Sequence, residues 1–183
     1  MGCHHRHAGC RQCGGGIENN PDDPGDSTEL GQGSWHGTHL AGTVAAVSNN
    51  SRGVTGVAWG AKVIPVRVLG VGGGTTYDVD QGVRYAAGLT NDSGTVPAEV
   101  ADIINLSLAG GDVTVDRNGD SNGDGVLSCI VDDTSGVRVT NYAFYQDTSM
   151  AAPHMAGVAA LMKAIDPGLT PSEFDFLLIV GNE

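Results

Sequence analysis

Asp147-Thr148-Ser149-Met150-Ala151-Ala152-Pro153-His154 is the stretch around which the fold is organised, because it opens a run of small and apolar residues down to Ile165. The run predicts a helix that starts near Ser149 and stops at Asp166-Pro167-Gly168. A helix start offers unpaired N–H groups and a positive dipole end, which suit the nucleophile and oxyanion of acyl transfer. The simpler explanation of a serine there is helix N-capping, so the rest of the chain must supply a base.

Further elements follow from the spacing of apolar residues. Leu40, Val44 and Val47 recur at helical spacing, and the predicted helix ends at Asn49–Gly53. Lys62–Leu69 and Ala101–Leu108 are nearly continuous apolar runs, typical of strands buried in a parallel sheet. A helical pattern between them, Tyr77–Leu89, makes a right-handed βαβ unit the expected topology.

The C-terminal half carries local signals for a hairpin and a last helix. Val126–Val131 and Val137–Tyr145 predict two short strands joined over Asp132–Gly136. Thr170 as N-cap, Pro171 as first helical residue and Glu173 three residues after the cap predict a capping box.

The composition limits the class of protein. The chain has 183 residues, 40% of them hydrophobic, and 29 glycines, which suits one compact α/β domain with tight turns. Its formal net charge of −12 argues against nucleic acid and anionic membranes as partners. No apolar run reaches membrane-spanning length and no signal segment follows Met1, so any export signal is expected outside this sequence. The composition defines no oligomeric state.

Residues 1–33 are expected to be a poorly ordered Cys/His-rich tail followed by a loop rich in Gly, Pro and Asp. Cys10 and Cys13, flanked by histidines, are also spaced for a borderline metal such as zinc. A metal site needs a scaffold that fixes its ligands, which favours the tail. Residues 34–183 are then the folded domain.

His36 is the candidate base for Ser149, because it stands at the head of a small-residue helix beside Gly37, which leaves room around the ring. His39 and His154 are better explained as packed structural histidines. Helix starts that carry His36 and Ser149 would face a cleft at the ends of parallel strands.

Two longer motifs carry a family resemblance. His36-Gly37-Thr38-His39-Leu40-Ala41-Gly42-Thr43 and Thr148–Gly157 resemble the histidine and serine signatures of the subtilisin-like serine proteases. Gly56-Val57-Ala58 and Ile104–Leu108 stand between them in the family's order. The resemblance implies an α/β, three-layer fold with a mostly parallel sheet flanked by helices, here incomplete.

The resemblance also implies roles for the matching residues. His36 would take the Ser149 proton and return it to the leaving amine, while Ser149 attacks the peptide carbonyl and forms an acyl-enzyme. The Ser149 N–H would be one oxyanion donor, and Ser107 and Leu108 would lie in the strand that pairs with an extended substrate. The protein is expected to be a secreted hydrolase, a serine endopeptidase of protein or peptide substrates that needs no cofactor for its chemistry.

Two parts of the family's site have no match here. The triad aspartate follows a hydrophobic strand, but only a polar loop precedes His36, so its role is not carried onto the loop's aspartates, Asp22, Asp23 and Asp26. The asparagine that donates to the oxyanion is not found in the short stretch between Leu108 and Ser149. The chain resembles a subtilase truncated before the histidine and in the middle. Weak catalysis is expected, and the alternative is an inactive remnant that binds calcium or peptides.

Two single positions depart from the family pattern. Asp147 stands where the family usually has glycine, so it is expected to need a backbone conformation that glycine adopts freely. Its carboxylate would also place negative charge near the oxyanion. Ala109 replaces the glycine of the substrate strand, so a Cβ would intrude on the binding groove.

An acidic segment provides the candidate metal site. Its oxygen-bearing side chains alternate as in an EF-hand or dockerin calcium loop, at Asp116, Asn118, Asp120 and Asp124. The turn glycine is replaced by Ser121 and the bidentate glutamate by Leu127. A structural calcium ion and a plain acidic surface loop explain the pattern equally well.

Overall fold

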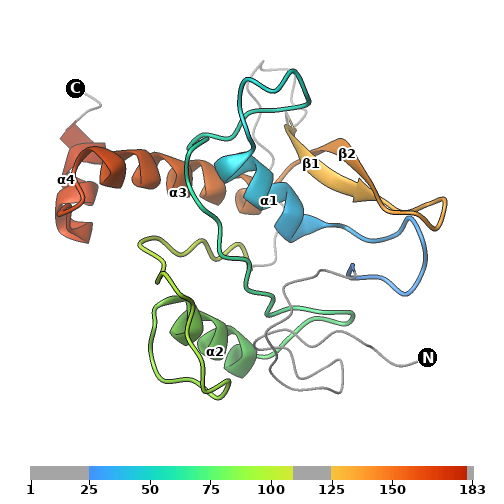
Figure 1. Cartoon of the computed structure of the whole chain (residues 1–183), viewed down its shortest axis with the longest axis horizontal. Helices are drawn as coiled ribbons and strands as arrows, with labels where there is room; N and C mark the ends of the chain where they lie inside the picture. Colours follow the sequence, from blue (N-terminus) through green and yellow to red (C-terminus); the bar gives the residue numbers. More distant parts are fainter. Residues whose placement is uncertain (1–24, 109–124, 181–183) are drawn as a thin grey trace. The chain divides into compact units, whose positions relative to one another are not determined.

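The computed structural model describes residues 25–108 and 125–180 (Figure 1). In chain order the described elements are α1 (His36–Ala45), α2 (Thr76–Ala86), β1 (Val126–Asp132), β2 (Val139–Tyr145), α3 (Thr148–Ile165) and α4 (Pro171–Val180). No helix in this part of the chain is long and apolar enough to cross a membrane.

The chain divides into two compact units. Within the described residues, the first unit contains residues 25–39, Lys62–Ile104 and Cys129–Ala143, and the second contains Leu40–Ala61, residues 105–108, residues 125–128 and residues 144–180. His36 therefore belongs to the first unit and Ser149 to the second. The expectation of a poorly ordered tail falls mainly on residues 1–24, which lie outside the described residues.

The helices α3 and α4 form where local signals predict them. α3 begins at Thr148 and ends at Ile165, followed by Asp166 in an extended conformation. Before α4, a Glu173 carboxylate oxygen accepts hydrogen bonds from the backbone N–H (2.9 Å) and hydroxyl (2.7 Å) of Thr170. These bonds lower the pKa of Glu173 below its ordinary value, because they favour the ionised carboxylate. The predicted capping box is confirmed.

α1 ends earlier than the predicted stop at Asn49–Gly53. It stops at Ala45, and Val47 is 64% exposed instead of lying on a packed helix face. The last carbonyls of the helix are taken by the returning chain, since the N–H groups of Gly56, Val57 and Ala58 donate to Ala46, Thr43 and Val44 at 2.8–3.0 Å. A Cβ at Gly56 would lie 2.4 Å from the Ala46 nitrogen, so only glycine allows this close return.

α2 is also shorter than expected, ending at Ala86 instead of Leu89. A capping box that the sequence reasoning missed starts it: Thr75 accepts from the Asp78 N–H, and Asp78 accepts from the Thr75 N–H. Gly88, with φ of +70°, turns the chain away from the helix axis. Gly82 lets α2 approach Val68 closely, because a Cβ there would lie 2.5 Å from a Val68 methyl group.

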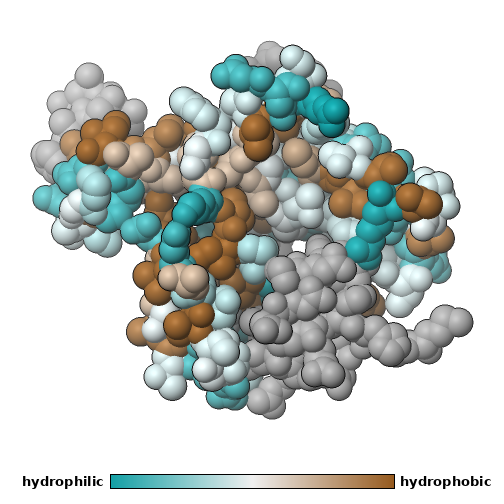
Figure 2. All heavy atoms as spheres, in the orientation of Figure 1, coloured by the Kyte–Doolittle hydropathy of each residue, from teal (hydrophilic) through white to brown (hydrophobic). Residues whose placement is uncertain are grey.

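The two predicted parallel strands are not formed. Lys62–Leu69 and Ala101–Leu108 run without assigned strand pairing, and the sheet of the described residues is the two-stranded β1–β2. A buried strand requires hydrogen-bonded neighbours on both sides, and without them apolar side chains reach the surface, as at Val63, Leu69, Ile104, Leu106 and Leu108. Figure 2 shows apolar side chains exposed among polar ones.

The predicted hairpin is confirmed, with β1 and β2 hydrogen-bonded as neighbours. Its turn is held by Asp132, whose carboxylate accepts from the hydroxyl (2.7 Å) and the N–H (3.0 Å) of Thr134. These two hydrogen bonds lower the pKa of Asp132. Gly136 follows with φ of +77°. In β1, burial raises the pKa of the Cys129 thiol, which disfavours the reactive thiolate.

Candidate active site

The turn before α1 is fixed by a carboxylate, and this places His36 at the helix start. Asp26 Oδ1 accepts from the Ser34 N–H at 2.6 Å, and the Ser34 hydroxyl donates to the other oxygen of Asp26. The His36 N–H donates to Ser34 Oγ at 3.3 Å. Asp26 therefore organises the approach to the helix.

Trp35 fixes the direction from which the chain enters α1. It is 3% exposed and has φ of +49°, a left-handed conformation that is strained for a bulky residue. Packing holds it there: the Arg138 guanidinium lies 5.2 Å from the ring centroid, within cation–π range, and a Cβ at Gly33 would lie 3.1 Å from the ring nitrogen. The sequence reasoning missed this residue, because a left-handed tryptophan has no local signal.

The His36 ring is half-buried, and within the described residues of its unit no carboxylate forms a hydrogen bond or ion pair with it. Asp22 and Asp23 lie outside the described residues. One turn later, His39 is fully buried and its Nε2–H donates to the Ala143 carbonyl at 3.1 Å. The structural interpretation of His39 is confirmed.

Ser149 is the second residue of α3 and is only 6% exposed. The N-cap is Asp147, so the explanation of Ser149 as an N-cap residue is wrong. Asp147 Oδ1 accepts from the N–H groups of Ser149 (2.6 Å) and Met150 (3.2 Å). Within the described residues of its unit the Ser149 hydroxyl makes no hydrogen bond, so it is not engaged in capping.

The backbone conformation at position 147 does not require glycine. Its φ of 172° and ψ of −174° are fully extended, a conformation that any residue adopts, so the expectation of a glycine-like conformation is wrong. An N-cap residue normally has this kind of extended backbone, and aspartate is among the best N-cap residues. The capping preference of Asp147 was the signal that could have predicted this contact.

Ser107 ties a distant segment to the first turn of α3. Its hydroxyl donates to the Ser149 carbonyl at 3.0 Å, and the Asn105 amide donates to Ser107 Oγ at 3.0 Å. The Ser149 carbonyl would normally accept from the N–H four residues later, but that residue is Pro153, which has none. The Ser107 hydroxyl supplies the missing donor.

The other nearby contacts in α3 are structural. His154 Nδ1–H donates to the Met150 carbonyl at 2.8 Å, in agreement with its predicted structural role. Gly157 is buried against Val57, and a Cβ there would lie 2.6 Å from Val57 Cβ. α3 therefore packs against the segment that closes the end of α1.

The remaining predicted site residues are placed as follows. Ser107 and Ser149 are brought together, Leu108 is exposed next to Ser107, and His36 lies in the other unit. The candidate calcium ligands and Ala109 lie outside the described residues, and the described part of the chain contains no other cluster suited to a metal. These outside positions are Asp116, Asn118, Asp120, Asp124 and Ala109.

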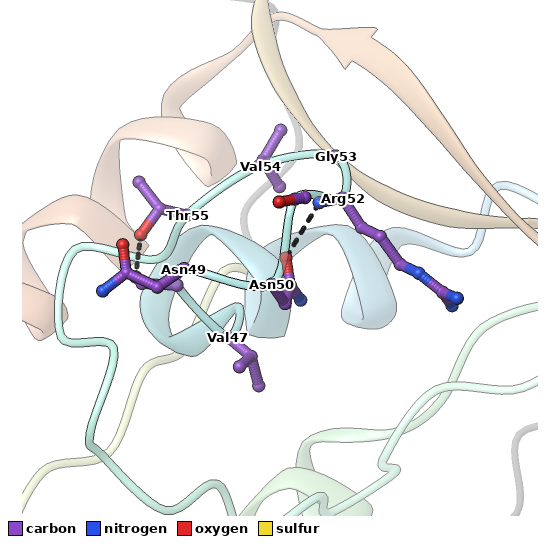
Figure 3. A pocket seen from close by; sticks show the side chains of 9 residues that line it. Val47, Asn49, Asn50, Arg52, Gly53, Val54 and Thr55 are labelled. Carbon is purple, nitrogen blue, oxygen red and sulfur yellow. Dashed lines mark hydrogen bonds between the residues drawn. The ribbon is translucent and has the colours of Figure 1, made fainter.

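An open hollow lies elsewhere in the second unit, lined by residues 47–55 (Figure 3). The Arg52 N–H donates to the Asn50 side chain across its turn at 3.0 Å. Asn49, Ser51 and Gly53 all have positive φ, which explains the tight winding of this loop. None of the predicted site residues lines the hollow.

Known proteins resemble this chain over most of its length. An extracellular protease from Xanthomonas campestris pv. campestris is 34% identical over 90% of this chain and 40% of that protein. An extracellular basic protease from Dichelobacter nodosus is 32% identical over 88% of this chain and 40% of that protein. The chain therefore spans about 40% of the length of these two relatives. The alignment with the Xanthomonas protein runs over 234 positions, more than the 183 residues of this chain, so it contains gaps.

In two further comparisons, this chain covers a larger share of the similar protein. Subtilisin Savinase from Lederbergia lenta is 34% identical over 84% of this chain and 70% of that protein. A solved protease structure from Pseudoalteromonas arctica is similar with a TM-score of 0.76 and 32% identity, covering 90% of this chain and 71% of that chain. This likeness shows the α/β fold of subtilisin-like proteases, here in partial form.

The family model described as the subtilase family matches residues 7–128 and, in a second piece, residues 114–180. Both signatures, around His36 and around Ser149, fall within these matches. The chain belongs to the subtilase family.

Proposed function

We propose that this chain is a serine-type endopeptidase that hydrolyses peptide bonds in proteins or peptides. The observation that carries the proposal is the position of Ser149, in the first turn of α3 with a hydroxyl free of capping bonds, inside a subtilase signature. The positive end of the α3 dipole favours the negative charge that develops next to this serine.

The proposed reaction has two steps. His36 takes the proton of Ser149 Oγ as the oxygen attacks the substrate carbonyl, and returns it to the leaving amine when the C–N bond breaks. Water, deprotonated by the same imidazole, then attacks the acyl-enzyme and releases the second product with regeneration of the serine. Residues around Ser107 and Leu108 are proposed to pair with the extended substrate backbone.

Low turnover is part of the proposal. In a serine-protease triad, loss of the aspartate lowers turnover by about 10⁴, and in subtilisin loss of one oxyanion donor lowers it by about 10²–10³. Neither helper has a match in the sequence, and no carboxylate partner of His36 lies among the described residues of its unit. The gaps in the alignment with the Xanthomonas protein support the idea that a middle block is missing.

Covalent labelling tests the proposal. A fluorophosphonate probe should label the wild-type chain at Ser149, found by mass spectrometry of its peptides, and Ser149→Ala should abolish the label. His36→Ala should slow labelling strongly while leaving the thermal unfolding temperature close to that of the wild type. A folded wild-type chain that takes no label would overturn the assignment of Ser149 as nucleophile.

A second candidate function is a non-catalytic subtilase remnant that binds calcium or peptides. It is favoured by the Asp147 carboxylate, which already holds the Ser149 N–H. Casein hydrolysis that disappears in Ser149→Ala would refute it. In either case we propose that the protein acts outside the cell, since the two relatives described above are named extracellular proteases.

A further inference from the structure

The first turn of α3 has its donors already occupied by a side chain of this chain. Asp147 Oδ1 accepts from the Ser149 N–H at 2.6 Å and from the Met150 N–H at 3.2 Å. The first of these is a short hydrogen bond to an ionised acceptor, the class that is about twice as strong as a neutral one. All three residues belong to one unit, so this geometry does not depend on the rest of the molecule.

The Ser149 N–H is also the donor that acyl transfer needs. In the proposed reaction, the attacked carbonyl oxygen becomes an anion next to Ser149 and must lie about 2.7–3.1 Å from its donors. Asp147 Oδ1 is itself an anionic oxygen at that distance from the same N–H. An oxyanion that formed there would either displace the carboxylate or lie beside a like charge.

From this overlap we infer that Asp147 is an internal block of the oxyanion site, an autoinhibitory contact that stabilises α3 at the expense of turnover. The inference rests on the proposed function, in which Ser149 is the nucleophile. The family's usual glycine at this position has no side chain that could reach the N–H. Because the Asp147 backbone is extended and unstrained, the substitution adds a good N-cap with no backbone penalty.

The block is local and can open without moving the helix. Asp147 is partly exposed, so rotation of its side chain toward water would free the Ser149 N–H, while the Met150 N–H would keep its hydrogen bond to the Asp147 backbone carbonyl at 3.1 Å. A substrate therefore has to compete with the Asp147 carboxylate for the Ser149 N–H. Removing the carboxylate should affect stability and activity in opposite directions, which an ordinary capping residue would not do.

Two variants of the full chain test this. Asp147→Gly removes the side chain, and Asp147→Asn keeps an oxygen that can cap the helix but removes the charge. We expect Asp147→Gly to raise the rate of fluorophosphonate labelling at Ser149 by about 10²-fold, the effect associated with one oxyanion donor, and to lower the unfolding temperature by about 1 °C, because glycine is itself a tolerated N-cap residue. Asp147→Asn should lie between Asp147→Gly and the wild type in both. If the wild type takes the label, a folded Asp147→Gly variant that labels no faster would overturn the inference.

A second measurement separates this inference from the proposed function. Ser149→Ala removes the nucleophile but keeps the backbone N–H of residue 149, so amide NMR can follow inorganic phosphate as an anion probe. Phosphate should shift the amide signals of residues 149 and 150 in the Ser149→Ala/Asp147→Gly double variant and not in Ser149→Ala. Equal shifts in both would refute the block. If the shifts differ as expected but no chain hydrolyses or labels, the block stands as geometry and the peptidase function fails.

Discussion

At the scale of single residues, the features that hold the candidate nucleophile come from positions far apart in the sequence. Asp147 caps α3 from one side, and Ser107 donates to the Ser149 carbonyl from a segment 42 residues away. Pro153 creates the need for that donor by lacking an N–H. All three residues determine the hydrogen bonds of one residue, through the backbone N–H and the backbone carbonyl oxygen of Ser149.

Replacing Ser107 with alanine should destabilise the protein by about 1–3 kcal/mol, because the buried Ser149 carbonyl loses its donor. Chemical denaturation measures the change. Pro153→Ala returns a backbone N–H to the helix, so Ser107→Ala should cost clearly less in a Pro153→Ala background. Equal costs in the two backgrounds would show that the hydroxyl is not the substitute donor.

At the scale of elements, the close contacts of helices depend on missing side chains. α3 packs on the segment after α1 through Gly157, where a Cβ would lie 2.6 Å from Val57 Cβ and 2.8 Å from Val57 Cγ1. These are carbon atoms of a stiff branched side chain, which cannot move aside easily.

Gly157→Ala should therefore destabilise the chain by about 1–3 kcal/mol through overpacking, reduced by up to about 1 kcal/mol from the better helix propensity of alanine. Gly37→Ala is the matched control, because it also lies in a helix but a Cβ there meets nothing within 4 Å. Thermal unfolding should show a lower midpoint for Gly157→Ala and an unchanged or higher one for Gly37→Ala. A similar rise of the unfolding midpoint in both variants would contradict the close packing of α3.

The elements also show what the sequence can predict. The helix stop at Asp166–Gly168, the capping box of Thr170 and the hairpin were correct, because neighbouring residues determine them. The strands at Lys62–Leu69 and Ala101–Leu108 were wrong, because pairing depends on partners that an apolar run does not reveal. In the site, His36 and Ser149 follow from their motifs, whereas Trp35 and the donor role of Ser107 depend on tertiary packing.

At the scale of the whole molecule, charge and apolar exposure act together. The net charge of −12 opposes compaction, and large apolar side chains such as Trp59 and Leu106 are exposed in the described residues. A cation bound to acidic side chains would relieve part of the repulsion. A partner that covers the exposed apolar side chains would also stabilise the folded chain.

If the segment around Asp120 binds calcium, as its ligand spacing suggests, calcium at about 100 times its dissociation constant should stabilise the fold by about 2.7 kcal/mol. Differential scanning calorimetry with calcium, and with magnesium at equal ionic strength, measures this. Asp120→Ala should remove the calcium-specific part. An equal shift with both ions, or one that persists in Asp120→Ala, would reduce the effect to general charge screening.

The hydrogen bond from Ser107 to the Ser149 carbonyl also affects how the protein fluctuates. The first turn of α3 and residues 105–107 cannot open separately without breaking it, so they should exchange their amide hydrogens as one cooperative unit. Thermodynamic reciprocity then applies: if a ligand on residues 105–107 strengthens binding at the turn that carries Ser149, a ligand on that turn strengthens binding at residues 105–107 by the same factor. The nucleophile and the neighbouring chain segment thus share one opening equilibrium.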